Sequence, residues 1–116
     1  STVKTVGIGA FENCTELKDI SLPTTLTEIN YYTFSGCTSL TTLTLHSKLT
    51  AINNYAFAGC KSLTEIHCKN SNPPLIGENT FRDVNRIGCK IFVPSKRAKK
   101  SYSTALYWNE FTIYIE

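Results

Sequence analysis

The chain has 116 residues, 41% of them hydrophobic, and a formal net charge of +3. This length suits one domain and leaves no room for two. The apolar stretches are only a few residues long, so the printed sequence contains neither a transmembrane helix nor the apolar core of a signal peptide. The positive charge belongs to the C-terminal part, because residues 71–116 hold seven Lys or Arg against four acids, whereas 1–70 hold five against five.

A 23-residue repeat organises most of the chain. Phenylalanine, cysteine and leucine each recur at this spacing, in the columns Phe11, Phe34, Phe57; Cys14, Cys37, Cys60; and Leu17, Leu40, Leu63. Further apolar columns are Ile20, Leu43, Ile66 and Val6, Ile29, Ile52. A fourth, degraded copy occupies residues 71–94. A period in the twenties predicts a solenoid, here of about four stacked coils.

Each repeat is predicted to contain one short strand and one turn. Residues 20–22, 43–45, 66–68 and 91–93 alternate as half-buried strands do, and stacking would pair them in parallel about 4.8 Å apart. The column two residues after each phenylalanine reads Asn13, Gly36, Gly59 and Asp83. These residue types tolerate a left-handed backbone, which predicts the end of a short helical segment that carries the phenylalanine.

The segments "INYYTFSGCTSLTTLTL" and "INNYAFAGCKSLTEIHC" resemble the leucine-rich repeat family, specifically its BspA-like branch, also called the Treponema pallidum type. The resemblance implies an α/β fold, a right-handed leucine-rich repeat solenoid with short parallel strands. It also implies a non-catalytic, cell-surface or secreted (extracellular) binding scaffold with an adhesion-type role. His46 and Lys69 depart from the family pattern where proline is usual, and Cys68 departs where leucine is usual.

Residues 1–94 are interpreted as the repeats and residues 95–116 as a C-terminal cap. The segment "CKIFVP" followed by "YWNEF" resembles the C-terminal cap of family members from Bacteroidetes. Ser95 is predicted to begin a helix over 96–106 whose inner face carries Ala98, Tyr102, Ala105 and Leu106. Trp108 and Phe111 are predicted to be buried, and "TIYI" to form a strand with Ile113 and Ile115 inward.

No comparable cap precedes Val6. We therefore expect either that upstream residues of a parent chain precede this sequence or that the N-terminal cap is very short. Association of molecules through an uncapped first coil is a further expectation.

The repeated cysteines admit a metal-binding or a packing interpretation. Packing is favoured because the column faces the interior, where a free cysteine behaves as a small hydrophobic residue. All five cysteines are expected to be free thiols, since the stacked positions lack the geometry of a disulfide. No metal or cofactor is predicted. The sequence also lacks a Ser-His-Asp pattern, a phosphate-binding glycine loop and paired carboxylates in an apolar setting, so no enzyme is predicted.

The candidate binding surface is the outward face of the strands. Its predicted ligand, a protein or a glycan, would contact Thr42, Thr44, Glu65, His67, Lys90 and Phe92. A metal shared by Glu65 and His67 is not favoured, because no third ligand is evident. Tyr31, Tyr32 and Tyr55 are interpreted as half-buried packing on the convex side.

Two alternatives remain open at this point. The chain could be a structural spacer within a larger surface protein. A polyanion could instead bind the basic C-terminal segment through Lys96, Arg97, Lys99 and Lys100, although a solvated helix face explains the same residues. Nucleic acid is not predicted, because no nucleic-acid-binding motif accompanies the charge.

Overall fold

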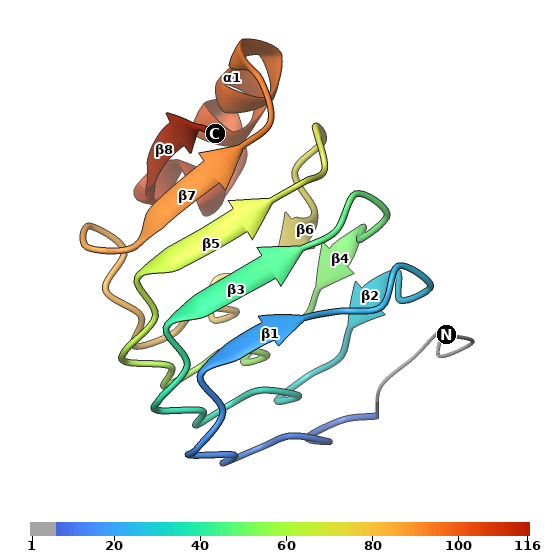
Figure 1. Cartoon of the computed structure of the whole chain (residues 1–116), viewed down its shortest axis with the longest axis vertical. Coiled ribbons are helices and arrows are strands. Elements are labelled where there is room, and N and C mark those ends of the chain that lie inside the picture. The colour runs from blue at the N-terminus through green and yellow to red at the C-terminus, as the bar shows by residue number, and fades with distance from the viewer. Residues whose placement is uncertain (1–6) are drawn as a thin grey trace.

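The computed structural model describes residues 7–116, so the repeat position Val6 lies outside the described residues. Two parallel sheets and a C-terminal helix form the fold (Figure 1). The larger sheet has the strand order β1 (Asp19–Ser21), β3 (Thr42–Leu45), β5 (Glu65–Cys68), β7 (Lys90–Val93), β8 (Thr112–Ile115). The smaller sheet has the order β2 (Glu28–Ile29), β4 (Ala51–Ile52), β6 (Leu75–Ile76). Helix α1 (Lys96–Thr104) and the 3-10 helix η1 (Trp108–Glu110) lie between β7 and β8.

The predicted parallel pairing of the larger sheet is confirmed. Ile20 pairs with Leu43, Leu43 with Ile66, and Ile66 with Ile91, so each strand is displaced from the next by one repeat. The strands begin one residue earlier than predicted. Leu43, Ile66 and Ile91 are fully buried, while their chain neighbours on the opposite face are partly or fully exposed. The alternation in the sequence therefore sets which side of the sheet faces the core.

The smaller sheet and the turns differ from the expectation. The segments that carry the phenylalanines form turns, and no helix precedes α1 in the part of the chain that the structure describes. Alternate N–H groups bond across to the next repeat, as in Phe34 N–H to Ala56 O at 2.8 Å and Gly36 N–H to Ala58 O at 2.8 Å, whereas Ser35 N–H bonds within the turn to Tyr32 O at 3.1 Å. This cross-repeat pairing replaces the bonds that a helix would make within itself.

The left-handed column is confirmed, because Asn13, Gly36, Gly59 and Asp83 all have positive φ. A second positive-φ column was not predicted, and its members are Gly9, Tyr32 and Tyr55. Two left-handed residues thus flank each of the first three phenylalanines of the column. They reverse the chain direction between the two sheets.

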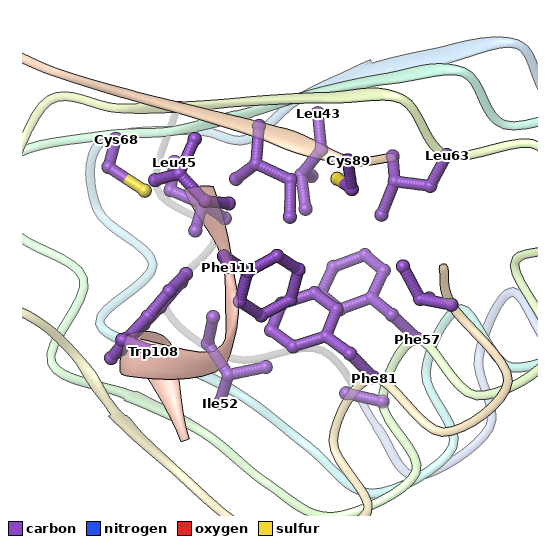
Figure 2. Packing of buried hydrophobic residues seen from close by; sticks show 14 of the residues in the cluster. Leu43, Leu45, Ile52, Phe57, Leu63, Cys68, Phe81, Cys89, Trp108 and Phe111 are labelled. Atoms are coloured by element: carbon purple, nitrogen blue, oxygen red, sulfur yellow. The ribbon is translucent and has the colours of Figure 1, made fainter. Parts of the chain in front are cut away.

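A stack of phenylalanine rings runs through the core, as Figure 2 shows for Phe57 and Phe81. The ring centroids of Phe11 and Phe34 lie 5.3 Å apart, those of Phe34 and Phe57 5.3 Å, and those of Phe57 and Phe81 5.5 Å, with near-parallel planes. Phe34, Phe57 and Phe81 are buried as predicted, whereas Phe11 is 44% exposed. The stack repeats because identical side chains occupy one column.

The cysteine column packs beside these rings. Cys37 and Cys60 are buried, and their thiols lie within hydrogen-bonding distance of the carbonyls of Phe11 (3.4 Å) and Phe34 (3.3 Å) in the preceding repeat. Cys14 is only partly buried, so the interior position holds for the later members of the column. All five cysteines are free, as expected. Burial raises the pKa of the Cys60 thiol to about 12, which keeps it protonated and unreactive.

The C-terminal segment covers the last repeat. Ser95 accepts a hydrogen bond from Ala98 N at 3.1 Å, which confirms the predicted N-cap. The helix ends at Thr104, before the predicted position 106, and Leu106 is 70% exposed, so its inward assignment is wrong. The helix stops where the chain must turn toward Trp108, whose indole N–H donates to Pro74 O at 2.8 Å.

Trp108 and Phe111 are buried as predicted, and both rings contact Phe81 at the end of the stack. Ile113 is buried, but Ile115 is 45% exposed. The inward assignment of Ile115 therefore overstated its burial, because β8 is the outermost strand of its sheet.

Candidate functional site

The outward side chains of the larger sheet form two rows that cross the strands. Strand register places one row at Asp19, Thr42, Glu65, Lys90 and Thr112. The second row is Thr44, His67, Phe92 and Tyr114. We call these two rows the strand face. All six predicted binding candidates lie on it, and the structure brings them together as neighbours on adjacent strands.

Three aromatic side chains of the second row stack on one another. The ring centroids of His67 and Phe92 lie 4.9 Å apart with an interplanar angle of 12°, and those of Phe92 and Tyr114 lie 5.7 Å apart at 30°. Each spacing is close to the distance between neighbouring strands, so the rings stand upright and face each other. Both faces of the Phe92 ring are consequently covered, and its edge points away from the sheet. The side chain still remains only half-buried.

Tyr114 was not among the predicted site residues. A signal for it existed, since the alternation of "TIYI" that turns Ile113 inward must turn Tyr114 outward. Tyr114 is 41% exposed, and the Lys90 ammonium lies 5.8 Å from its ring centroid. This distance is within the range of a cation–π interaction.

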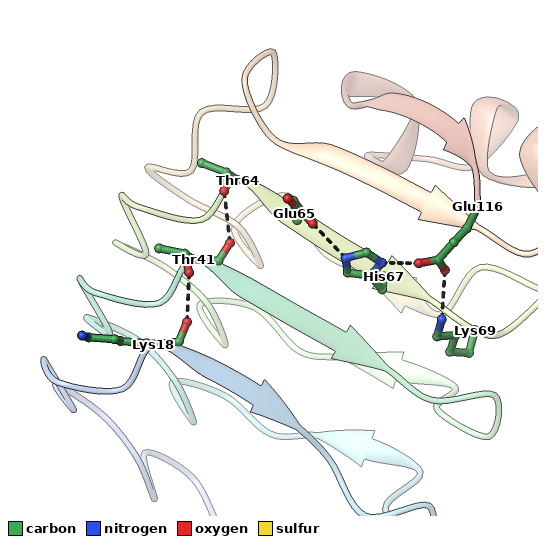
Figure 3. Close-up of polar contacts among 7 residues, drawn as sticks. All are labelled: Lys18, Thr41, Thr64, Glu65, His67, Lys69 and Glu116. Carbon is green, nitrogen blue, oxygen red and sulfur yellow. Dashed lines mark hydrogen bonds and ion pairs between the residues drawn. The ribbon is translucent and has the colours of Figure 1, made fainter.

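A polar network surrounds His67 (Figure 3). Its Nε2 lies 3.0 Å from Glu65 Oε1, and its Nδ1 lies 2.6 Å from Glu116 Oε1. The Lys69 ammonium donates to the other Glu116 oxygen at 2.9 Å. Hydrogen bonds from Lys69 and from His67 lower the pKa of the Glu116 carboxyl.

The network holds the imidazole ring against Phe92. Each ring nitrogen lies within hydrogen-bonding distance of one carboxylate oxygen, and the tautomer decides which nitrogen donates. Glu65 therefore serves as a partner of His67 in this arrangement, and the two do not form an open pair of metal ligands. No set of three His, Cys, Asp or Glu side chains among residues 7–116 is placed to hold a metal ion.

Threonines occupy the β3 positions of the strand face. Thr42 and Thr44 are half-buried on β3. Just before the strands, the hydroxyl of Thr64 donates to Thr41 O at 3.3 Å, and that of Thr41 donates to Lys18 O at 3.2 Å (Figure 3). These bonds tie successive repeats together and fix the spacing of the outward side chains.

The basic residues of the polyanion alternative lie on α1, and all four are exposed: Lys96, Arg97, Lys99 and Lys100. None of them takes part in an ion pair within the described part of the chain. The first turn of α1 contains no acidic residue. Cations at this end oppose the helix dipole, so helix stability does not account for their placement.

The tyrosines of the opposite side form a smaller aromatic group. Tyr32 and Tyr55 stack with centroids 5.0 Å apart. The expectation of half-buried packing holds for Tyr55 but not for Tyr31 and Tyr32, which are 44% and 39% exposed. Tyr32 and Tyr55 both have positive φ.

His46, which follows β3 where the family pattern has proline, is buried. Its Nδ1 accepts a hydrogen bond from Lys48 N at 3.1 Å, and its Nε2 has no partner among the described residues. It lies in the turn after the strand and away from the two rows of the strand face. No helix in the described part of the chain is both long and apolar enough to cross a lipid bilayer.

Comparison with known proteins gives one family. Residues 1–109 match the family profile described as BspA type Leucine rich repeat region (6 copies). A search of curated proteins gave no match. The profile spans nearly the whole sequence, and its repeat agrees with the register of the larger sheet. The chain therefore belongs to the BspA-type leucine-rich repeat family.

Proposed function

We propose that the protein is a non-catalytic binding module of a cell-surface or secreted protein, with the strand face as its binding surface. Leucine-rich repeat proteins of this type are generally binding modules rather than enzymes. The observation that carries the proposal is the aromatic stack around Phe92, which remains half-exposed on an open sheet face. Rigid aromatic side chains held in place by neighbours are favoured at binding hot spots, because little side-chain entropy is lost on binding.

The geometry of the stack favours a protein partner over a neutral glycan. A sugar ring packs on the open face of an aromatic ring, but both faces of Phe92 are covered by His67 and Tyr114, which leaves only the outer face of Tyr114 at the edge of the sheet. The ring edges, the phenol hydroxyl and the Lys90 ammonium remain available. Ring edges carry partial positive charge and accept carbonyl oxygens or further aromatic rings, which a polypeptide surface supplies.

The test is a binding screen on protein and glycan arrays, followed by variants of each confirmed interaction. Phe92→Ala is expected to weaken binding by about 2 kcal/mol or more, as a hot-spot residue would. Leu75→Ala is the matched control, because Leu75 is an exposed apolar residue on β6 of the other sheet. If both variants bind the partner with the same affinity as the wild type, the binding surface lies away from the strand face.

We also propose the arrangement of the whole chain as a right-handed solenoid of about four 23-residue coils. Residues 1–94 would form the coils and residues 95–116 the cap. The constant register of β1, β3, β5 and β7 supports the coils. The burial of Trp108 and Phe111 against Phe81 supports the cap, because the last coil of a solenoid needs an apolar cover.

Polyanion binding is the second candidate, and the four unpaired cations of α1 favour it. A sulfated glycan such as heparin is the probe. If this candidate is correct, affinity falls steeply with salt, and charge reversal of Lys96, Arg97, Lys99 and Lys100 abolishes binding. Binding that is independent of salt and of these four changes would refute it.

A further inference from the structure

Strand β8 is an unpaired edge of the larger sheet. It pairs with β7 on one side, and no strand among residues 7–116 pairs with its other side (Figure 1). It is four residues long, like β3, β5 and β7, so it is not shortened. Its sequence TIYI contains no proline or charged residue. Natural proteins usually protect an edge strand by such residues, by a bulge or by shortening, because exposed edges pair with other chains.

The backbone of β8 leaves hydrogen-bonding groups on this open edge. The N–H of Glu116 donates to Val93 O at 2.8 Å, toward β7. In parallel strands the backbone groups of successive residues point to opposite sides. Thr112 and Tyr114 therefore also face β7, whereas the N–H and C=O groups of Ile113 and Ile115 face the open edge.

On β8, Ile115 ends an inward row of side chains and Tyr114 ends an outward row. An added strand would continue both rows. Ile115 pairs with Val93 in the inward direction, and Val93 is fully buried whereas Ile115 is 45% exposed. Tyr114 ends the aromatic stack and has a ring neighbour only at Phe92. A strand beside β8 would cover Ile115 on one side of the sheet and the free face of Tyr114 on the other.

The positive charge near this edge favours an acidic partner. Helix α1 lies against β8 and contains four exposed cations and no acid. The acids nearest in sequence are already engaged, since Glu110 pairs with Arg86 at 3.3 Å and Glu116 pairs with Lys69 at 2.9 Å. A second copy that docked edge to edge would bring two basic helices together, and like charges oppose that arrangement. An acidic segment would be complementary.

We propose that β8 is a docking edge for an extended acidic segment of a partner protein, which adds to the sheet as a further strand. Main-chain hydrogen bonds to Ile113 and Ile115 would supply affinity, as in other cases of β-strand addition. Side chains of an added strand alternate between the two faces of the sheet, so apolar residues at alternate positions would cover either Ile115 or Tyr114. The acidic residues between them would supply the negative charge that the cations of α1 attract. This surface is the edge of the sheet and shares only Tyr114 with the strand face.

The probe is a terminally blocked peptide of alternating valine and glutamate, about eight residues long. Its counterpart of alternating valine and lysine is the charge control. Calorimetric titration should show binding of the glutamate peptide alone. In the amide NMR spectrum of the labelled protein, the signals of Ile113 and Ile115 should shift most. Lys99→Glu combined with Lys100→Glu should weaken binding about tenfold or more.

Two substitutions at one position isolate the backbone donor. Ile115→Ala removes the side chain and keeps the edge N–H, whereas Ile115→Pro removes both. The proline variant should bind about tenfold more weakly than the alanine variant, since loss of one hydrogen bond is expected to cost about that much. If the proline variant has a lower melting temperature than the alanine variant, the test is instead the set of amide signals of the wild-type protein that shift on adding the peptide. These signals must include those of Ile113 and Ile115.

Three results would overturn the proposal. The first is that the glutamate peptide does not bind at about 1 mM. The second is that Ile115→Pro binds the peptide as tightly as Ile115→Ala, which would indicate a purely electrostatic site on α1. The third is that light scattering shows dimers that Ile115→Pro dissociates, which would identify a second copy as the occupant. None of these results bears on the strand face, which Phe92→Ala tests separately.

Discussion

Replacing Phe34 with alanine would remove a central ring of the phenylalanine stack. Phe34 is 3% exposed and lies 5.3 Å from the ring centroids of both Phe11 and Phe57. An aromatic side chain buries about 200 Å², and at roughly 25 cal/mol per Å² its burial contributes about 5 kcal/mol. Substitutions of buried phenylalanine by alanine cost about 3–5 kcal/mol. We expect the free energy of unfolding to fall within that range.

Phe11→Ala is the internal comparison, because Phe11 occupies the same column but is 44% exposed and stacks on one phenylalanine only. With about half the burial, its loss should cost about 2 kcal/mol. Urea unfolding followed by circular dichroism measures both variants. Equal losses, or a loss below about 1 kcal/mol for Phe34→Ala, would show that the stack is not the stabilising core.

Three further predictions concern polar and ionisable groups. The Thr80 hydroxyl accepts a hydrogen bond from the half-buried N–H of Gly77 and contacts the carbonyls of Ile52 and Asn53 in the preceding repeat. Thr80→Val removes this hydroxyl and should lower the free energy of unfolding by about 1–3 kcal/mol in urea melts. The pKa of Cys60 is raised from 9.0 to about 12, so stability should fall as pH rises from about 9 toward 12, and urea melts of Cys60→Val should show a smaller fall. The pKa of Glu116 is lowered below 4.5 by Lys69 and His67, so Glu116→Gln should lower the free energy of unfolding by about 0.5 kcal/mol or less at neutral pH. Urea melts should show no difference between the variant and the wild type once acidification protonates Glu116 in the folded protein.

The sequence by itself predicted the features that repeat. Columns such as Phe34 and Phe57, or Leu43 and Ile66, could be assigned to the core because a constant period places identical side chains one above another. Parallel pairing followed from the same period. The left-handed residues could be assigned because few residue types tolerate positive φ without a large steric cost. The N-cap at Ser95 required only local information.

Other local features escaped sequence reasoning. Strands β2, β4 and β6 have two residues each, which is too short for alternation to be recognised. The turns around the phenylalanines were predicted to be helical, because a compact segment that ends in a left-handed residue has the same local signature as a helix end. Only the neighbouring repeat decides the outcome, since it accepts the hydrogen bonds that a helix would have kept within itself.

Tertiary structure alone decided what the C-terminal segment adds to the strand face. Glu65, His67 and Phe92 could be placed on one surface from the repeat, but Glu116 joins His67 across 49 residues of sequence. That contact exists because α1 returns the chain to pair β8 with β7, which brings Tyr114 into the aromatic stack and leaves Ile115 on an open edge. The 23-residue period ends before this segment, so no repeating pattern could specify where its side chains meet the rest of the sheet.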